Sequence, residues 1–243
     1  SGSMQIVFDT TYNKILFQNP APEIIGYSHG GFYGEFLGNR HEALENIVAD
    51  KYFGWGLSEQ NIVQNRFMIN KPNNKKIKSI FLVGSQPINP LINSYFSGLD
   101  IISSEADYFT KRILNDNNVN FTYLIHPSTD KENIQLDFDN QSSFNELTKV
   151  ELDTGLYIID RPGQTVLYRC IYEALPFVLI YNDNWKSFFT PKFLQLLELL
   201  ESKGLLFWYS QKYDFLKNIT CYNDGKIFNK YLFTEIRNFL ERG

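Results

Sequence analysis

From residue 79 to the C-terminus, short apolar runs alternate with segments of helical character, and this alternation restricts the fold more than any other feature. The runs are apolar at consecutive positions, so strands formed there are buried on both faces. Such strands, separated by helices, form a parallel sheet covered on both sides, with right-handed crossovers. The sequence therefore predicts an α/β fold. The expected strands are residues 79–84, 121–125, 155–159, 177–181 and 205–208, and the expected helices are residues 104–115, 164–174, 191–202, 213–219 and 230–242.

Two stretches of this region are assigned from local signals. Ser104 precedes an acidic turn, which is typical of a helix N-cap, so the first helix is expected to begin there. Residues 130–153 are polar and weakly patterned, and we expect a long loop.

The chain before residue 79 is less regular. Short strands are expected at residues 6–8, 15–17, 23–27 and 51–56, and a helix at residues 41–50. Residues 71–76 are polar and contain a proline, which is typical of a linker. We therefore expect a partial N-terminal α/β unit (residues 4–70), a linker (71–78) and a larger domain (79–243).

Composition and charge exclude several classes of protein. Hydrophobic residues make up 43% and charged residues 21% of the chain, a balance typical of a globular protein rather than a disordered one. The net charge of −4 argues against a general nucleic-acid binder, and no apolar run approaches the ~20 residues that cross a bilayer. Cys170 and Cys221 are too few for a disulfide framework, so we expect a reducing, cytoplasmic location, at most peripheral to the inner membrane.

Polar residues at the ends of the expected strands form the candidate ligand site, because open parallel sheets bind ligands beyond the carboxyl ends of their strands. A helix is expected to begin near residues 163–165, and the free N–H groups at its start favour binding of an anion such as phosphate. On that helix, Glu173 could bind a ribose diol, and His126 could donate to a phosphate. The candidate nucleotide-binding residues are Ser85, His126, Pro127, Asp160, Gly163, Gln164, Thr165 and Glu173.

Each of these residues also has a purely structural interpretation. Gly163 and Thr165 could cap the helix, and Glu173 could pair with Arg169 one turn earlier. His126 could be an ordinary loop histidine, and His29 could brace the adjacent glycine turn.

Common motifs for phosphate binding, metal binding and acyl transfer are absent. The chain has no GxxxxGK[ST] loop, no GxGxxG after a strand, no HExxH, no CxxC pair and no GxSxG. Its three histidines are widely spaced, so we expect no metal centre.

Two segments carry a resemblance to a known group of enzymes. Residues 26–34 (GYSHGGFYG) and 49–56 (ADKYFGWG) resemble the histidine-glycine-glycine turn and the aromatic strand of sugar transferases from bacterial surface-carbohydrate clusters. Residues 160–165 (DRPGQT), followed by YEALP at 172–176, are similar to the donor-site helix of the same family, although Arg161 and Gln164 replace small residues there. His126-Pro127 also resembles an element of transferases that use CMP-activated sugars.

The resemblance implies a GT-B glycosyltransferase, in which two Rossmann-like domains face each other across a cleft. It implies transfer from a nucleotide-sugar, possibly CMP-activated, to a surface polysaccharide or lipid-linked acceptor, with no cofactor or metal. His29 would be the catalytic acid or base, with Asp9 as a second candidate, and Gly30, Gly31 and Tyr33 would form the acceptor-side loop.

The short N-terminal unit leaves other functions open. About 70 residues precede the linker, whereas a GT-B enzyme has a whole acceptor domain there. We therefore also expect association with a second copy or a partner chain. The alternatives are a non-catalytic nucleotide-sugar-binding subunit that completes its cleft with a partner, and a sugar-nucleotide epimerase of related fold.

Overall fold

The larger part of the molecule is built on a six-stranded parallel sheet. The computed structural model describes residues 23–28, 32–57, 62–63, 76–84, 99–125, 140–144 and 146–242. The strand order is β6-β5-β4-β7-β8-β9, and all five pairings are parallel. The strands are β4 (Ser79–Val83), β5 (Thr122–Ile125), β6 (Gln141–Ser143), β7 (Gly155–Ile159), β8 (Phe177–Tyr181) and β9 (Leu206–Trp208).

This strand order is that of the Rossmann fold. The first three strands add outward from β4 and the last three add outward from β7 on its other side. Chain direction across the sheet therefore reverses between β4 and β7, which makes this pair the topological switch point. The expected α/β fold with a parallel sheet is confirmed.

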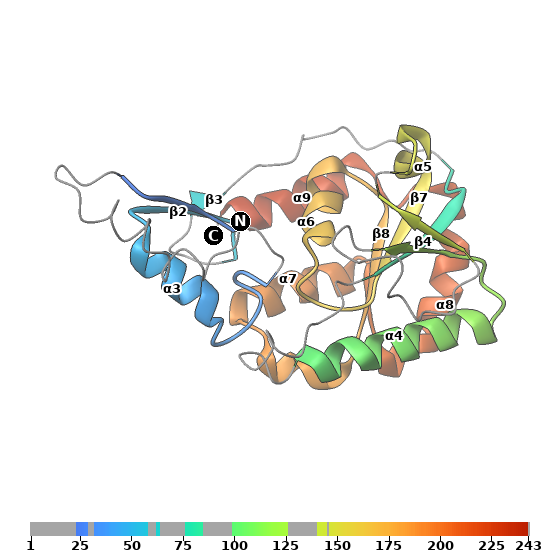
Figure 1. Ribbon diagram of the computed structural model, residues 1–243. Coiled ribbons are helices and arrows are strands. Elements are labelled where there is room, and N and C mark those ends of the chain that lie inside the picture. The colour runs from blue at the N-terminus through green and yellow to red at the C-terminus, as the bar shows by residue number, and fades with distance from the viewer. Residues whose placement is uncertain are drawn as a thin grey trace.

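Helices cover both faces of the sheet. In Figure 1, α6, α7 and α9 lie on the face toward the N-terminal unit, and α4 and α8 lie on the opposite face. The short α5 leads directly into β7. The α-helices are α4 (Leu99–Asp116), α5 (Lys149–Thr154), α6 (Thr165–Glu173), α7 (Pro191–Ser202), α8 (Lys212–Cys221) and α9 (Lys230–Glu241), and the 3-10 turns are η3 (Asp183–Phe188), η4 (Tyr209–Gln211) and η5 (Tyr222–Asp224). No helix of the described ranges is long and apolar enough to cross a bilayer.

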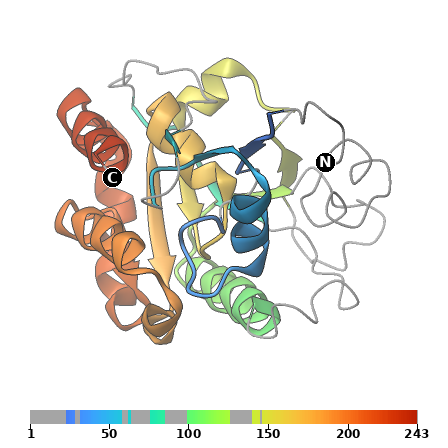
Figure 2. The same ribbon diagram turned by 90° about the vertical axis from the view of Figure 1, so that its left-hand side faces the viewer.

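The N-terminal residues form a second, smaller parallel sheet. Its strands are β1 (Ile25–Tyr27), β2 (Lys51–Gly54) and β3 (Ile62–Val63), in the order β1-β2-β3, and α3 (Arg40–Val48) connects the first two. This unit packs on the helical layer formed by α6, α7 and α9 (Figure 2). Its Trp55 ring stacks on Tyr168 of α6 with 4.6 Å between centroids.

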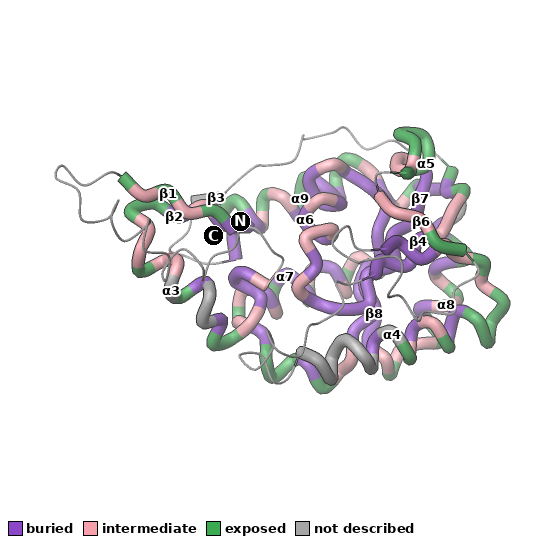
Figure 3. Tube along the Cα trace, in the orientation of Figure 1, coloured by how far each residue is buried: buried purple, intermediate pink, exposed green. Residues whose placement is uncertain are grey.

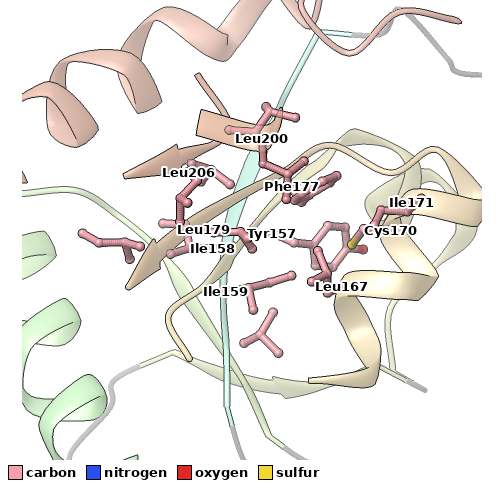
Figure 4. Close-up of a cluster of buried hydrophobic side chains, with 14 of the residues drawn as sticks. Tyr157, Ile158, Ile159, Leu167, Cys170, Ile171, Phe177, Leu179, Leu200 and Leu206 are labelled. Carbon is pink, nitrogen blue, oxygen red and sulfur yellow. The ribbon is translucent and has the colours of Figure 1, made fainter. Parts of the chain in front are cut away.

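The core lies between the large sheet and its helices. Every residue of β7 and β8 is buried, as Figure 3 shows for the centre of the sheet. In Figure 4, Leu167 and Cys170 of α6 lie over Tyr157 and Ile159 of β7. Because each fully buried aliphatic side chain contributes about 1.5–3 kcal/mol, this layer dominates the stability of the fold.

Two local assignments are wrong. The helix expected from Ser104 begins five residues earlier, at Leu99, so Ser104 lies inside α4. The loop expected at residues 130–153 contains β6 and α5; Thr148 and Glu151 form a capping box at the start of α5. Among the described residues β6 pairs with β5 alone, and such an edge position tolerates the polar residues of this strand.

Other expectations for the N-terminal half have different outcomes. The strands at 23–27 and 51–56 are confirmed with shorter bounds, and the helix at 41–50 is confirmed but begins one residue earlier and ends two residues earlier. The strands at 6–8 and 15–17 fall outside the described residues. The division into a unit, a linker and a domain stays a prediction.

Candidate functional site

A buried ion pair follows β7 at the switch point. The Arg161 Nε atom donates to the Asp160 Oδ1 atom at 2.9 Å, and both side chains are almost completely buried. Removal of two charges from water costs several kcal/mol each, so such a pair is seldom kept for stability alone. Its position beside β4, where nucleotides bind in this topology, favours a functional role.

Gly163 has a conformation and a contact that only glycine tolerates. Its φ of +81° lies in the left-handed region, and a Cβ atom there would overlap the ring of Phe32. The loop before α6 therefore lies directly against Phe32 of the N-terminal unit. The helix itself begins at Thr165, with Gln164 as an N-cap that makes no side-chain hydrogen bond to the helix.

Glu35 joins the N-terminal unit to this loop. The Gly163 N–H donates to its Oε2 atom at 2.7 Å, and the Tyr168 hydroxyl donates to its Oε1 atom at 2.6 Å. The Glu35 side chain has no exposed surface. Burial raises the pKa of Glu35 to about 8 and the nearby Glu42 charge adds to the rise, whereas the bonds from Tyr168 and Gly163 oppose it. The carboxyl group therefore exchanges its proton in the range where acid–base groups operate.

Further hydrogen bonds hold the segment around Glu35 on the larger domain. The Thr190 N–H donates to the Glu35 carbonyl at 2.8 Å, and the Thr190 hydroxyl donates to the Gly34 carbonyl. Behind this segment, the Gly34 N–H donates to Glu42 at 2.7 Å. Residues 32–39 are thus held from both sides. We call the contact between this segment and the loop before α6 the junction.

Tyr33, expected on the acceptor side, is part of this support. Its hydroxyl donates to Glu45 at 3.0 Å, and Tyr52 donates to the same carboxylate. The ring is 5% exposed, so in this structure Tyr33 is a buried member of the junction rather than an open surface residue.

The structure brings part of the expected nucleotide site together. Asp160, Gly163 and Gln164 lie on the loop between β7 and α6, and Thr165 is the first residue of α6. The Gly163 N–H, expected to face a phosphate, donates its hydrogen bond to Glu35 in this structure. Its role in phosphate binding, like those of its neighbours, stays a prediction.

Glu173 lies at the other end of α6. Eight residues separate it from Thr165, which is about 12 Å along a helix. Its Oε2 atom accepts from Arg169 at 3.0 Å, and the Arg169 guanidinium lies 5.1 Å from the Phe144 ring centroid. The structure therefore contains the i, i+4 pair that was the structural alternative for Glu173; binding of a ribose stays a prediction.

The remaining candidates fall outside the described residues. They are Asp9, His29, Gly30, Gly31, Ser85, His126 and Pro127.

Sequence reasoning missed three buried residues of the junction, Glu35, Tyr168 and Tyr181. The Tyr181 hydroxyl is buried at the end of β8 and has no hydrogen-bond partner in the described structure. Burial raises its pKa, and the charges of Glu35 and Asp160 raise it further, so this hydroxyl lies within electrostatic reach of both carboxyl groups. A carboxylate within an otherwise aromatic segment, FYGEF at residues 32–36, was the available signal.

The described residues contain no group of three or more His, Cys, Asp or Glu side chains arranged to hold a metal ion.

Comparison with known proteins identifies the family of the chain. Neither the curated proteins nor the solved structures gave a match. The model of one family, described as LIC12162 family transferase, matches residues 5–213. The match includes the glycine turn, the Rossmann-like sheet from β4 to β9, and the Glu35 junction. The chain therefore belongs to the LIC12162 family of transferases.

Proposed function

We propose that the protein is a glycosyltransferase of GT-B type that moves a sugar from a nucleotide-sugar to a surface glycan or its lipid-linked precursor. Its family supports group transfer. Its strand order supports a nucleotide as the donor, because sheets of this order bind nucleotides at the switch point. The observation that carries the proposal is the hydrogen bond from the Gly163 N–H to Glu35, which holds this part of the N-terminal unit against the loop at that point.

In the proposed complex, the donor phosphate lies at the N-terminus of α6. The first N–H groups of a helix have no acceptor within it, and the helix dipole adds partial positive charge. The N–H groups of Gln164 and Thr165 would stabilise the negative charge that develops on phosphate as its bond to the sugar breaks. Because these groups supply the stabilisation, the scheme needs no metal. Ser85, His126 and Pro127 follow the neighbouring strands and would complete the pocket.

His29 is the proposed acid or base. It precedes Phe32 by three residues, which span at most about 11 Å, and Phe32 contacts Gly163. This closeness along the chain supports a role beside the leaving phosphate, where a histidine can exchange a proton near neutral pH. Asp9 remains the second candidate. The His126-Pro127 element supports a CMP-activated sugar as the donor.

Exposed apolar side chains on the N-terminal unit favour a second candidate function. Ile47 is 79% exposed, Leu37 59%, Tyr27 46% and Ile25 45%. Apolar surface of this kind often marks a contact with another protein. A nucleotide-sugar-binding subunit that completes its cleft with a partner chain would use such a surface. Light scattering would show a stable dimer or a monomer, and a monomer with full transfer activity would exclude this candidate.

A thermal-shift screen with CMP, UDP, GDP and TDP tests the donor assignment. A nucleotide at 100 times its dissociation constant stabilises by about 2.7 kcal/mol, which raises Tm by roughly 5–10 °C for a chain of this size. Thr165→Val should lower the affinity for the nucleotide and so reduce the thermal shift. Thr220→Val on α8 is the matched control and should leave the shift unchanged. No shift with any of the four nucleotides would contradict the proposed function.

A further inference from the structure

A long groove runs between α7 and α9, outside the proposed donor site. Its volume is about 1270 Å³, more than the roughly 300–1,000 Å³ of pockets for single small molecules. Residues of both helices line it, together with Leu57 of the N-terminal unit. Figures 1 and 2 show the two helices side by side. The size and shape of the groove fit a chain-like ligand.

The groove carries a cation at each end of α9. Lys230 is the first residue of α9 and Arg242 is its C-cap, so the two lie twelve residues apart, about 18 Å along a helix. Neither Lys230 nor Arg242 forms an ion pair with another described residue. The one carboxylate in the lining, Glu235, is paired with Lys203 at 2.9 Å. The chain as a whole is acidic, so this local excess of cations points to an anionic ligand.

The other lining groups match a saccharide. Tyr231 is 85% exposed, so its ring contributes little to the core and offers a flat face on which the apolar side of a sugar ring can stack. Thr234, Asn238 and Gln195 line the same groove. Their hydroxyl and amide groups can both donate and accept hydrogen bonds, as sugar hydroxyls require.

One end of the groove reaches the junction with the donor loop. Thr190 lines the groove, and its N–H donates to the Glu35 carbonyl at 2.8 Å. Glu35 in turn accepts from Gly163. A chain lying in the groove would therefore present one end next to the loop that holds the donor in the proposed function.

We propose that the groove between α7 and α9 binds the acceptor, and that this acceptor is an oligosaccharide bearing carboxylate or phosphate groups. The assignment rests on the proposed glycosyl transfer and specifies its acceptor. Lys230 and Arg242 bind the anionic groups, and Tyr231 stacks on a sugar ring between them.

Calorimetric titration of the full chain with hexagalacturonate, a carboxylated sugar chain, tests the proposal. Binding should be measurable and should weaken as salt is added. Lys230→Glu combined with Arg242→Glu should reduce affinity on the order of tenfold, because two attractions become repulsions. The control, Lys149→Glu combined with Lys217→Glu, changes net charge equally at sites outside the groove and should leave affinity nearly unchanged. Tyr231→Ala should weaken binding, and Tyr213→Ala, which removes a similarly exposed ring on α8, should not.

Two probes separate charge from sugar recognition, and a phosphorylated oligosaccharide separates the two kinds of anion. Maltohexaose lacks charge and should bind more weakly than hexagalacturonate; hexaglutamate lacks sugar rings and should also bind more weakly. Equal binding of hexaglutamate, or an equal loss in the control variants, would overturn the proposal. The rise in Tm that a nucleotide causes should be the same in the groove variants as in the parent chain. A chain that binds nucleotide but neither anionic sugar would therefore refute the groove assignment and leave the donor assignment standing.

Discussion

Replacement of Glu35 by glutamine should change how stability depends on pH. Burial raises the pKa of Glu35 in the folded protein to about 8, whereas its ordinary pKa of 4.5 applies in the unfolded chain. Between these values the folded state keeps a proton that the unfolded state has released, so stability falls as pH rises. From pH 5 to pH 8 the loss is three pH units at 1.36 kcal/mol each, roughly 4 kcal/mol. Glutamine cannot titrate, so Glu35→Gln should escape this loss.

Urea unfolding of both proteins at several pH values from 5 to 9 would measure the effect. The difference in unfolding free energy between Glu35→Gln and the parent chain isolates Glu35, because other groups titrate alike in both. That difference should move in favour of the variant up to about pH 8 and then level off. A flat difference for Glu35→Gln would mean that the bonds from Gly163 and Tyr168 outweigh burial and keep the carboxylate ionised throughout.

Three further substitutions test the junction and the proposed chemistry. Gly163→Ala should destabilise the protein by about 2–3 kcal/mol in urea unfolding, because its left-handed φ and its contact with Phe32 exclude a side chain; a smaller loss would mean that the loop can move away. Arg161→Ala deprives buried Asp160 of its ion-pair partner and should cost about 3–5 kcal/mol by the same measurement, and an unchanged midpoint would contradict a strongly coupled pair. His29→Ala should abolish sugar transfer while calorimetry gives the parent Tm, and full activity would remove His29 from the mechanism.

The sheet was predictable because its signal is local. The apolar runs at β7 and β8 bury every residue, and a fully buried strand has an unmistakable pattern. The β6 strand was missed because an edge strand pairs on one side only and tolerates polar residues. The capping box of Thr148 and Glu151 was present in the sequence, but the polar stretch around it obscured the short helix.

The site was only partly predictable. The loop at residues 160–165 follows from the rule that ligands bind beyond strand ends, and that rule needs only the order of elements. The contact between Glu35 and Gly163 could not be predicted, because 128 residues separate them and no local sequence pattern indicates it. The same holds for the stack of Trp55 on Tyr168, which joins two units whose sequences give no sign of contact.

That stack has a consequence for how the chain folds. The Tyr168 ring stacks on Trp55, and its hydroxyl donates a hydrogen bond to Glu35. One side chain of α6 is therefore buried against both units. Loss of the N-terminal unit would uncover the Tyr168 ring and remove the acceptor of its hydroxyl. Units that share buried groups in this way open together rather than one after the other. The border of the Rossmann-like topology at β4 is therefore not a border of cooperative unfolding, and residues 32–57 unfold together with the helices on which they pack.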